Sequence, residues 1–197
     1  MNDYKNMPDE QLVQLSLNNQ DYFYYLMKRY EIKLLRYIKR LTTVSPEEAK
    51  DIIQEIFIKV YRNLNGFNPK LKFSSWIYRI AHNEIINQYR KTKLCSSIIS
   101  LNIEDESNLI DAINDSIEID GAYENLETAE RVRKAIAKLP DKYREILVLR
   151  YLEDKSYEEI SDILRKPPGT VATQINRAKA SFKKIAWRHQ LDKEIIK

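Results

Sequence analysis

The chain contains little glycine, cysteine or histidine, and each scarcity excludes something. It has 3 glycines in 197 residues. Since sheets and tight loops usually use glycine in their turns, this composition favours a helical fold. Its one cysteine, Cys95, cannot form an internal disulfide. Its two histidines, His82 and His189, leave few candidates for a zinc site or a histidine-based catalytic triad.

Long apolar runs and enzyme motifs are also missing. No segment resembles a signal peptide or a membrane span, so we expect a cytoplasmic protein without membrane insertion. The sequence has no glycine-rich phosphate loop, no Cys/His cluster and no nucleophile motif. We therefore expect no enzyme activity, no cofactor, no metal site and no small-molecule substrate. Among enzymes, the alternative is a metal-dependent nuclease built from scattered carboxylates.

Charged residues are plentiful but unevenly divided along the chain. Residues 1–93 hold 16 basic and 10 acidic side chains, and residues 131–197 hold 17 and 9. Residues 94–130 hold 10 acidic side chains and no basic one. Like charges repel and extend a segment that lacks sustained helical periodicity. We predict domains at 1–93 and 128–197 joined by a flexible acidic linker at 94–127, and the alternative is an ordinary loop with a short packed helix.

Apolar residues recur at helical spacing on both sides of this linker, which predicts an all-α fold of two small helical domains. The helices predicted in the first domain cover 10–19, 22–41, 46–64 and 74–93. Those predicted in the second domain cover 127–139, 142–152, 157–165 and 170–187. Two of them open with the pattern of a capping box, Ser45 with Glu48 and Ser156 with Glu159.

The predicted helix 46–64 has one apolar residue out of place. Its buried stripe is formed by Ala49, Ile52, Ile53, Ile56, Phe57, Val60 and Leu64. Ile58 falls opposite this stripe, among Asp51, Gln54 and Glu55. An exposed apolar residue ringed by polar ones is typical of a small protein interface. A lone surface isoleucine without function is the alternative.

The last two predicted helices, joined by the turn "KPPG", have the spacing of a helix-turn-helix, whose second helix enters the major groove of DNA. One face of the second helix is apolar, at Val171, Ile175, Ala178, Phe182 and Ile185. The opposite face carries Thr173, Asn176, Arg177, Ala180, Lys183 and Lys184. Small polar residues followed by positive charge suit base edges and then phosphates. A solvated amphipathic helix is the alternative.

Two blocks of sequence resemble the extracytoplasmic-function (ECF) group of bacterial sigma-70 factors. Segment 139–182 is similar to region 4 of that family, on Leu139 with Pro140, "LRY" at 149–151, "SYEEI" at 156–160, "GTV" at 169–171 and "RAK" at 177–179. Region 2 is matched by "LMKRYEIKLLRYIKRL", "EEAKDIIQEIFIKVYRNL" and "FSSWIYRIAHNEIINQYRK", in the family's order and spacing. Two blocks in the right order are more specific than either alone.

The resemblance implies a sigma factor that binds core RNA polymerase, directs it to specific promoter DNA and is held by an anti-sigma factor. The core-binding residues that it implies are Asp51, Gln54, Glu55 and Ile58. Those implied for the minus 10 element, where one base is flipped into a protein pocket, are Asn65, Phe67, Asn68, Trp76, Arg79, Asn83 and Arg90. Those implied for the minus 35 element are Thr173, Gln174, Asn176, Arg177, Lys179, Lys183 and Lys184.

Alternatives remain for parts of this assignment. Trp76 could instead be a core residue, because a large ring at a helix start often plugs a domain. A stand-alone helix-turn-helix regulator that binds DNA by itself would share the second domain. It would not explain Ile58 or the acidic linker.

The chain departs from the family pattern in and around the predicted turn. Ala172 and Gln174 stand where the family commonly has Lys and Arg, so two cationic donors to the minus 35 element are lost. Arg165 stands where the family usually has glycine, at a cost of about 1 kcal/mol if φ must be positive. Lys166 replaces an apolar residue, and Pro168 adds a second fixed φ. Minus 35 recognition is therefore expected to differ.

Overall fold

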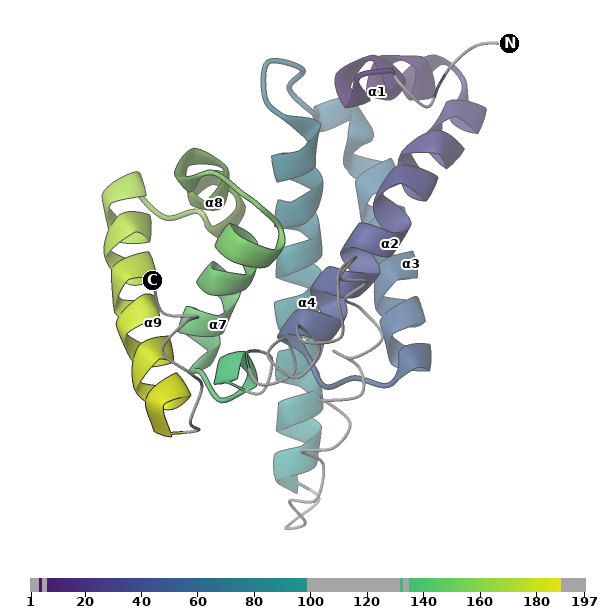
Figure 1. Ribbon diagram of the computed structural model, residues 1–197. Coiled ribbons are helices and arrows are strands. Elements are labelled where there is room, and N and C mark those ends of the chain that lie inside the picture. Colours follow the sequence, from purple (N-terminus) through teal and green to yellow (C-terminus); the bar gives the residue numbers. More distant parts are fainter. Residues whose placement is uncertain (1–3, 5–6, 99–131, 133–134, 189–197) are drawn as a thin grey trace, which may run out of the picture. The chain divides into compact units, whose positions relative to one another are not determined.

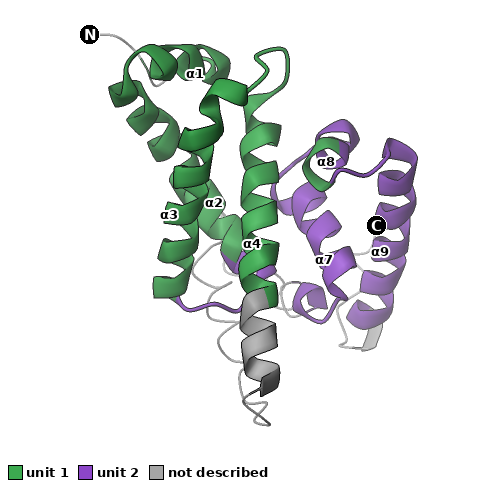
Figure 2. Cartoon of the chain, turned by 180° about the vertical axis from the view of Figure 1, so that it is seen from behind, with its two compact units in different colours: residues 1–38, 46–100, 162–164 green, residues 39–45, 101–161, 165–197 purple. Residues whose placement is uncertain are grey.

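The structure is a computed structural model that describes residues 4, 7–98, 132 and 135–188, and every regular element in these ranges is a helix (Figure 1). The predicted all-α fold is confirmed. The chain divides into two compact units, coloured separately in Figure 2. One unit comprises α1, most of α2, α3 and α4, and the other comprises α7, most of α8 and α9. In the described part of the chain, each helix is either too short or too polar for a transmembrane segment.

The first unit contains the four helices predicted for it and two short 3₁₀ turns that were not predicted. Its elements in chain order are α1 (Asp9–Asn18), η1 (Gln20–Tyr22), α2 (Phe23–Leu41), α3 (Pro46–Asn63), η2 (Leu64–Gly66) and α4 (Phe73–Ile98). The helix predicted to end at Lys93 continues to Ile98. Most of the predicted acidic linker, residues 99–127, lies outside the described residues.

The core of this unit lies between α2, α3 and α4. All seven predicted stripe residues of helix 46–64 are buried, and α3 packs this stripe against α4. On α2, Leu34, Tyr37 and Ile38 are fully buried. Each such side chain contributes about 1.5–3 kcal/mol of hydrophobic free energy. Because this packing fixes the rotation of α3 about its axis, the opposite face of α3 must point to solvent.

Helix α4 is buried over a wider arc than its sequence pattern predicts. His82, expected on its polar face, is 9% exposed, and its Nδ1 lies 3.1 Å from the Tyr37 hydroxyl oxygen of α2. Glu84 is also buried, where it forms an ion pair with Lys59 of α3 and accepts a hydrogen bond from Gln88. Because α4 contacts both α2 and α3, His82 and Glu84 are covered, and each has a partner on the helix that covers it.

The second unit follows the predicted pattern with one local difference. Its elements are α7 (Asp141–Leu147), η3 (Val148–Leu152), α8 (Tyr157–Leu164) and α9 (Pro168–Arg188). The predicted helix 142–152 is an α-helix that ends in the π-helical turn η3. The helix predicted over 127–139 lies mostly outside the described residues. Helix α7 packs against α9, whose residues Val171, Ile175 and Ala178 are fully buried.

Both helices of the helix-turn-helix begin with residues that suit a helix N-terminus. The predicted capping box of α8 is confirmed, since Ser156 Oγ accepts from the Glu159 N–H (3.2 Å) and the Glu159 carboxylate accepts from the Ser156 N–H (2.8 Å). Pro168 is the first residue of α9. At that position a helix needs no N–H donor and the proline φ is already helical. The second proline therefore starts α9 two residues earlier than predicted.

Arg165 ends α8 in the left-handed conformation, with φ of 52°. Its N–H donates to the Ser161 carbonyl oxygen, and the Ser161 hydroxyl donates to the Lys166 carbonyl oxygen (2.6 Å). The closure of the turn thus requires a positive φ at the position where the family usually has glycine. A side chain at this position is strained, because its Cβ approaches the following carbonyl oxygen.

We expect Arg165→Gly to raise the free energy of unfolding by about 0.5–1 kcal/mol, since glycine removes that strain and loses part of the gain to its greater freedom in the unfolded chain. Urea unfolding followed by circular dichroism measures the change. Asp154, with φ of 48°, is the matched control. Because aspartate tolerates this conformation better, Asp154→Gly should give a smaller gain. Equal or opposite effects at the two positions would contradict the strain argument.

Candidate functional site

Helix α3 presents the four predicted core-binding residues together on its solvent face. Asp51, Gln54, Glu55 and Ile58 are all exposed, and their spacing of three and four residues puts them on one side of the helix. Ile58 is 41% exposed. An apolar side chain thus stands in water with three hydrogen-bonding side chains along the same face. This is the predicted arrangement of an anchor and its polar surroundings.

The structure adds Tyr61 to this face, a residue that was not predicted from the sequence. Tyr61 lies three residues after Ile58 and is 45% exposed. Its ring packs at 5.1 Å from the ring of Phe23, and its hydroxyl donates to Gln20 at 3.4 Å. The spacing from Ile58 was the available signal. A tyrosine held in this way offers a large, ordered apolar area beside the isoleucine.

The predicted minus 10 residues divide into an exposed set and a buried set. Asn65, within η2, and Asn68, between η2 and α4, are both exposed. Asn68 shapes this segment, since its side-chain oxygen accepts from the Lys70 N–H (3.0 Å) and its carbonyl accepts from the Leu71 N–H (3.0 Å). Leu71 is 47% exposed and was not selected from the sequence. The segment 65–72, called the loop below, is therefore an ordered turn with polar and apolar side chains toward solvent.

Beneath this loop lies a buried cluster of aromatic rings. Phe67 and Trp76 are 6% and 7% exposed, with ring centroids 5.4 Å apart. Phe73 is fully buried, with its ring centroid 5.4 Å from that of Phe67 and 5.6 Å from that of Trp76. Trp76 is therefore a core residue, as the alternative interpretation predicted. The buried rings of Phe67, from the loop, and Trp76, from α4, pack together on the inner side of the loop, and this pair is called the floor of the loop.

Helix α4 also carries the remaining predicted minus 10 residues. Asn83 and Arg90 are exposed, seven residues apart and thus on one face. Arg79, four residues before Asn83, is half-buried. A polar stripe therefore runs along α4 from Arg79, in the second turn of the helix, to Arg90.

Helix α9 exposes most of the predicted minus 35 residues. Those exposed are Thr173, Asn176, Arg177, Lys179, Lys183 and Lys184, while Gln174 is half-buried. The hydroxyl of Thr173 donates to the Gly169 carbonyl oxygen (2.9 Å), which leaves its lone pairs to accept from a partner. Phe182 and Ile185, predicted on the apolar face, are partly buried against Ala135 and Ala186. The face opposite this core is polar at its start and cationic toward its end.

Two residues on the flanks of this face have neighbours that the sequence did not reveal. The ammonium of Lys179 lies 5.5 Å from the ring centroid of Tyr151, and a hydrogen bond to Tyr151 raises the pKa of Lys179. The ammonium of Lys166 donates to the side-chain oxygen of Gln174 (3.1 Å). Two departures from the family pattern, Lys166 and Gln174, are thus in contact. The ammonium of Lys166, from the turn, therefore lies beside Gln174, a position where the family commonly has a cationic side chain.

Comparisons with known proteins match both units to one family. The family model for Sigma-70 region 2 matches residues 26–94, and that for Sigma-70 region 4 matches residues 129–182. The ECF RNA polymerase sigma factor SigW of Bacillus subtilis is 34% identical over 90% of this chain and 96% of its own. The ECF RNA polymerase sigma-E factor of Escherichia coli is 33% identical over 89% and 93%. The chain belongs to the ECF group of the sigma-70 family.

Solved structures have the same fold. CnrH, in a complex with the cytosolic domain of CnrY, has a TM-score of 0.64 at 22% identity and matches 90% of this chain and 96% of its own. The sigma factor RpoE of Bartonella quintana, in a complex with the anti-sigma factor NepR, has a TM-score of 0.57 at 18% identity, over 81% and 95%.

Proposed function

We propose that this sigma factor binds core RNA polymerase through the exposed face of α3, with Ile58 as the apolar anchor and Asp51, Gln54 and Glu55 as its hydrogen-bonding rim. The observation that carries this proposal is the exposure of Ile58 on a helix whose stripe of aliphatic and phenylalanine residues is entirely buried. Nothing within the packing of α3 requires an isoleucine there. A partner that covers Ile58 would remove its side chain from water, and this burial would contribute hydrophobic free energy to binding.

We propose further that the two units contact separate promoter elements. The exposed polar and cationic face of α9 suits the major groove at the minus 35 element. The loop and the polar stripe of α4 suit the melted minus 10 element, where Asn65 and Asn68 can bond a flipped base and Arg90 can contact phosphate. Two weak DNA contacts held on one polymerase gain affinity through effective concentration. The factor recruits the polymerase and contributes no catalysis of its own.

Control by an anti-sigma factor belongs to the same proposal. Two solved relatives of this fold are in complexes with other proteins, CnrH with the cytosolic domain of CnrY and RpoE with the anti-sigma factor NepR. We propose that a protein of that class covers the core-binding face of this chain, since one partner on Ile58 excludes the other.

The test is capture of core RNA polymerase by the full chain, followed by transcription from a library of promoters randomised in both elements. We expect polymerase to be retained and a defined set of promoters to be transcribed only when the factor is present. Retention of promoter DNA without polymerase, at equal affinity, would favour the stand-alone regulator instead.

The contact between Lys166 and Gln174 makes a prediction about base preference. A lysine ammonium can only donate, so it competes with a base for the oxygen of the Gln174 amide and favours contacts in which the amide offers its N–H donors. Gln174 then suits a base with acceptor atoms, such as guanine, and loses the paired contact that glutamine makes with adenine. We expect Lys166→Met to free the oxygen and shift preference at one minus 35 position toward adenine, by up to about tenfold.

Selection from the minus 35 library measures this shift. Lys142→Met, which removes an exposed cation from α7, is the matched control and should leave every preference unchanged. An unchanged preference in Lys166→Met would show that Gln174 reads no base.

A further inference from the structure

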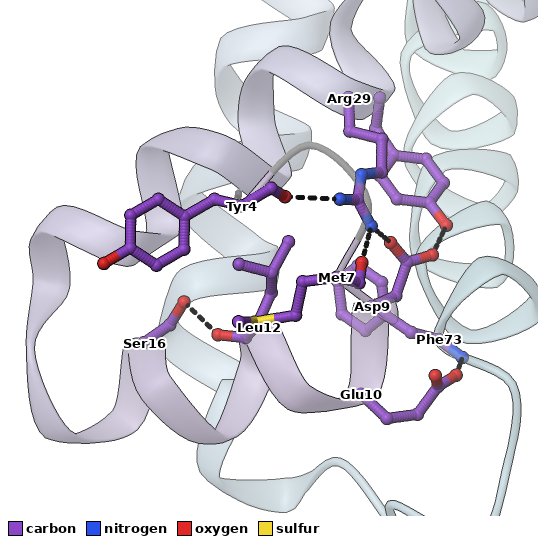
Figure 3. A network of polar contacts seen from close by, with 9 residues as sticks. Tyr4, Met7, Asp9, Glu10, Leu12, Ser16, Arg29 and Phe73 are labelled. Carbon is purple, nitrogen blue, oxygen red and sulfur yellow. Dashed lines mark hydrogen bonds and ion pairs between the residues drawn. The ribbon is translucent and has the colours of Figure 1, made fainter. Parts of the chain in front are cut away.

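Arg29 of α2 fastens the segment that precedes and begins α1 (Figure 3). Its Nη2 donates to the Tyr4 carbonyl oxygen (2.9 Å), and its Nη1 donates to the Met7 carbonyl oxygen (2.7 Å). The same Nη1 pairs with Asp9 Oδ1 at 2.5 Å. Arg29 and Asp9 are 23% and 19% exposed at their side chains, so the pair is partly shielded from water and salt. One planar guanidinium thus fixes three points of this segment.

The second carboxylate oxygen of Asp9 continues this connection inward. It accepts a hydrogen bond from the hydroxyl of Tyr30, which is 3% exposed. Burial and the Asp9 carboxylate raise the pKa of Tyr30, so its hydroxyl stays protonated and remains a donor. The ring of Tyr30 meets the ring of Phe73 edge to face, with centroids 5.6 Å apart.

The next residue of α1 reaches Phe73 by a different route. A carboxylate oxygen of Glu10 accepts the backbone N–H of Phe73 at 3.0 Å, as Figure 3 shows. Phe73 is the first residue of α4, so its N–H has no partner within that helix. A negative charge at a helix N-terminus is also favourable to the helix dipole. Glu10 therefore caps α4 from another helix, although Glu10 and Phe73 are 63 residues apart in sequence.

Phe73 also directly follows the loop. Its ring packs against the rings of both Phe67 and Trp76 in the aromatic cluster. Two adjacent residues of α1 therefore hold Phe73, Glu10 by the backbone and Asp9 through the ring of Tyr30. Any movement of Phe73 would shift both the floor of the loop and the first turn of α4.

We propose that Glu10 and Asp9, with Arg29 behind them, are positioning residues that set the conformation of the loop and so sharpen its discrimination among minus 10 sequences. This inference rests on the proposed function of the loop. The residues do not themselves contact DNA. They fix the position of a base-reading element, and selective sites require such elements to be held to within about 0.5 Å.

Substitutions at Glu10 separate the hydrogen bond from the charge. Glu10→Gln keeps an oxygen that can accept the Phe73 N–H, Glu10→Asp keeps the charge but is one methylene too short, and Glu10→Ala loses both. Gln11→Ala, at an exposed neighbour on the same helix, is the control. All are made in the full chain and assayed well below their own unfolding midpoints.

The first measurement is hydrogen exchange of the Phe73 amide. We expect it to quicken roughly tenfold in Glu10→Asp and Glu10→Ala, the loss expected when one partner of a partly buried hydrogen bond is removed. It should stay near the wild-type rate in Glu10→Gln and Gln11→Ala. Equal exchange in all four variants would overturn the anchoring of the loop by Glu10.

The second measurement is base preference in the minus 10 library with polymerase bound. We expect Glu10→Asp and Glu10→Ala to flatten this preference about tenfold, as expected when a reading element is misplaced. Minus 35 preference and polymerase affinity should stay unchanged, and Glu10→Gln should retain wild-type selectivity. Faster exchange with intact minus 10 preference, or parallel losses at both elements, would leave Glu10 a structural residue and overturn the inference. A wild-type factor that selects no promoter would instead overturn the proposed function, and this inference with it.

Discussion

Replacement of Ile58 by aspartate is expected to abolish binding to core RNA polymerase while the protein stays folded. The side chain is 41% exposed and lies opposite the buried stripe of α3, so the free energy of unfolding should change by less than about 0.5 kcal/mol. In the complex the same position would be covered. Loss of a central anchor weakens binding by at least ~30-fold, and an unpaired carboxylate buried in its place adds to that loss.

Titration of labelled factor with core polymerase measures the affinity, and thermal unfolding followed by circular dichroism measures the stability. Leu17→Asp is the matched control, because Leu17 of α1 is 40% exposed and the substitution introduces the same charge. It should bind polymerase like the wild type. Undiminished affinity in Ile58→Asp, or an equal loss in Leu17→Asp, would remove the α3 face as the docking site.

The fold could be predicted from the sequence where helical periodicity and capping signals agree. The stripe of α3 and the capping box of α8 are local patterns, and both were confirmed by the structure. Periodicity also predicted the exposure of Ile58, because a residue opposite the buried stripe of an amphipathic helix faces solvent. These features depend on residues within one or two helical turns of each other.

The features that the sequence did not predict depend on which elements meet in space. His82 is buried because α2 supplies Tyr37 to bond it, and the sequence of α4 alone holds no sign of that partner. In the sequence, Glu10 is simply an acidic residue in the first turn of a predicted helix. Its contact with Phe73 forms only when α1 and α4 pack together. The π-helical turn η3 likewise has no periodic signature.

The candidate site shows the same division between local and distant information. The exposed faces of α3 and α9 followed from spacing, whereas the burial of Phe67 did not, because a loop has no period. The pairing of Lys166 with Gln174 joins two residues that each depart from the family pattern. Their contact means that they are best treated as one change, in which a cation moves from the recognition helix to the turn.

Arg177 lies at the middle of the exposed face of α9, four residues after Thr173 and seven before Lys184. The buried residues Ile175 and Ala178 on either side of it fix the rotation of the helix, so its guanidinium must project from the face opposite the core. Arginine contacts guanine through two parallel hydrogen bonds and phosphate through one or two. The two kinds of contact have different consequences when the side chain is removed.

Arg177→Ala is expected to weaken promoter binding by the polymerase complex about 5- to 150-fold if the contact is to a base, and to relax preference at one minus 35 position only. If the contact is to phosphate, binding weakens evenly across sequences and the slope of log affinity against log salt falls by about one. Promoter binding at two salt concentrations, with matched and mismatched minus 35 elements, separates the two. Lys142→Ala removes the same charge from the exposed surface of α7 and should change neither quantity. Wild-type affinity at both salt concentrations would take Arg177 out of the interface, and α9 would then have to read DNA through its flanks.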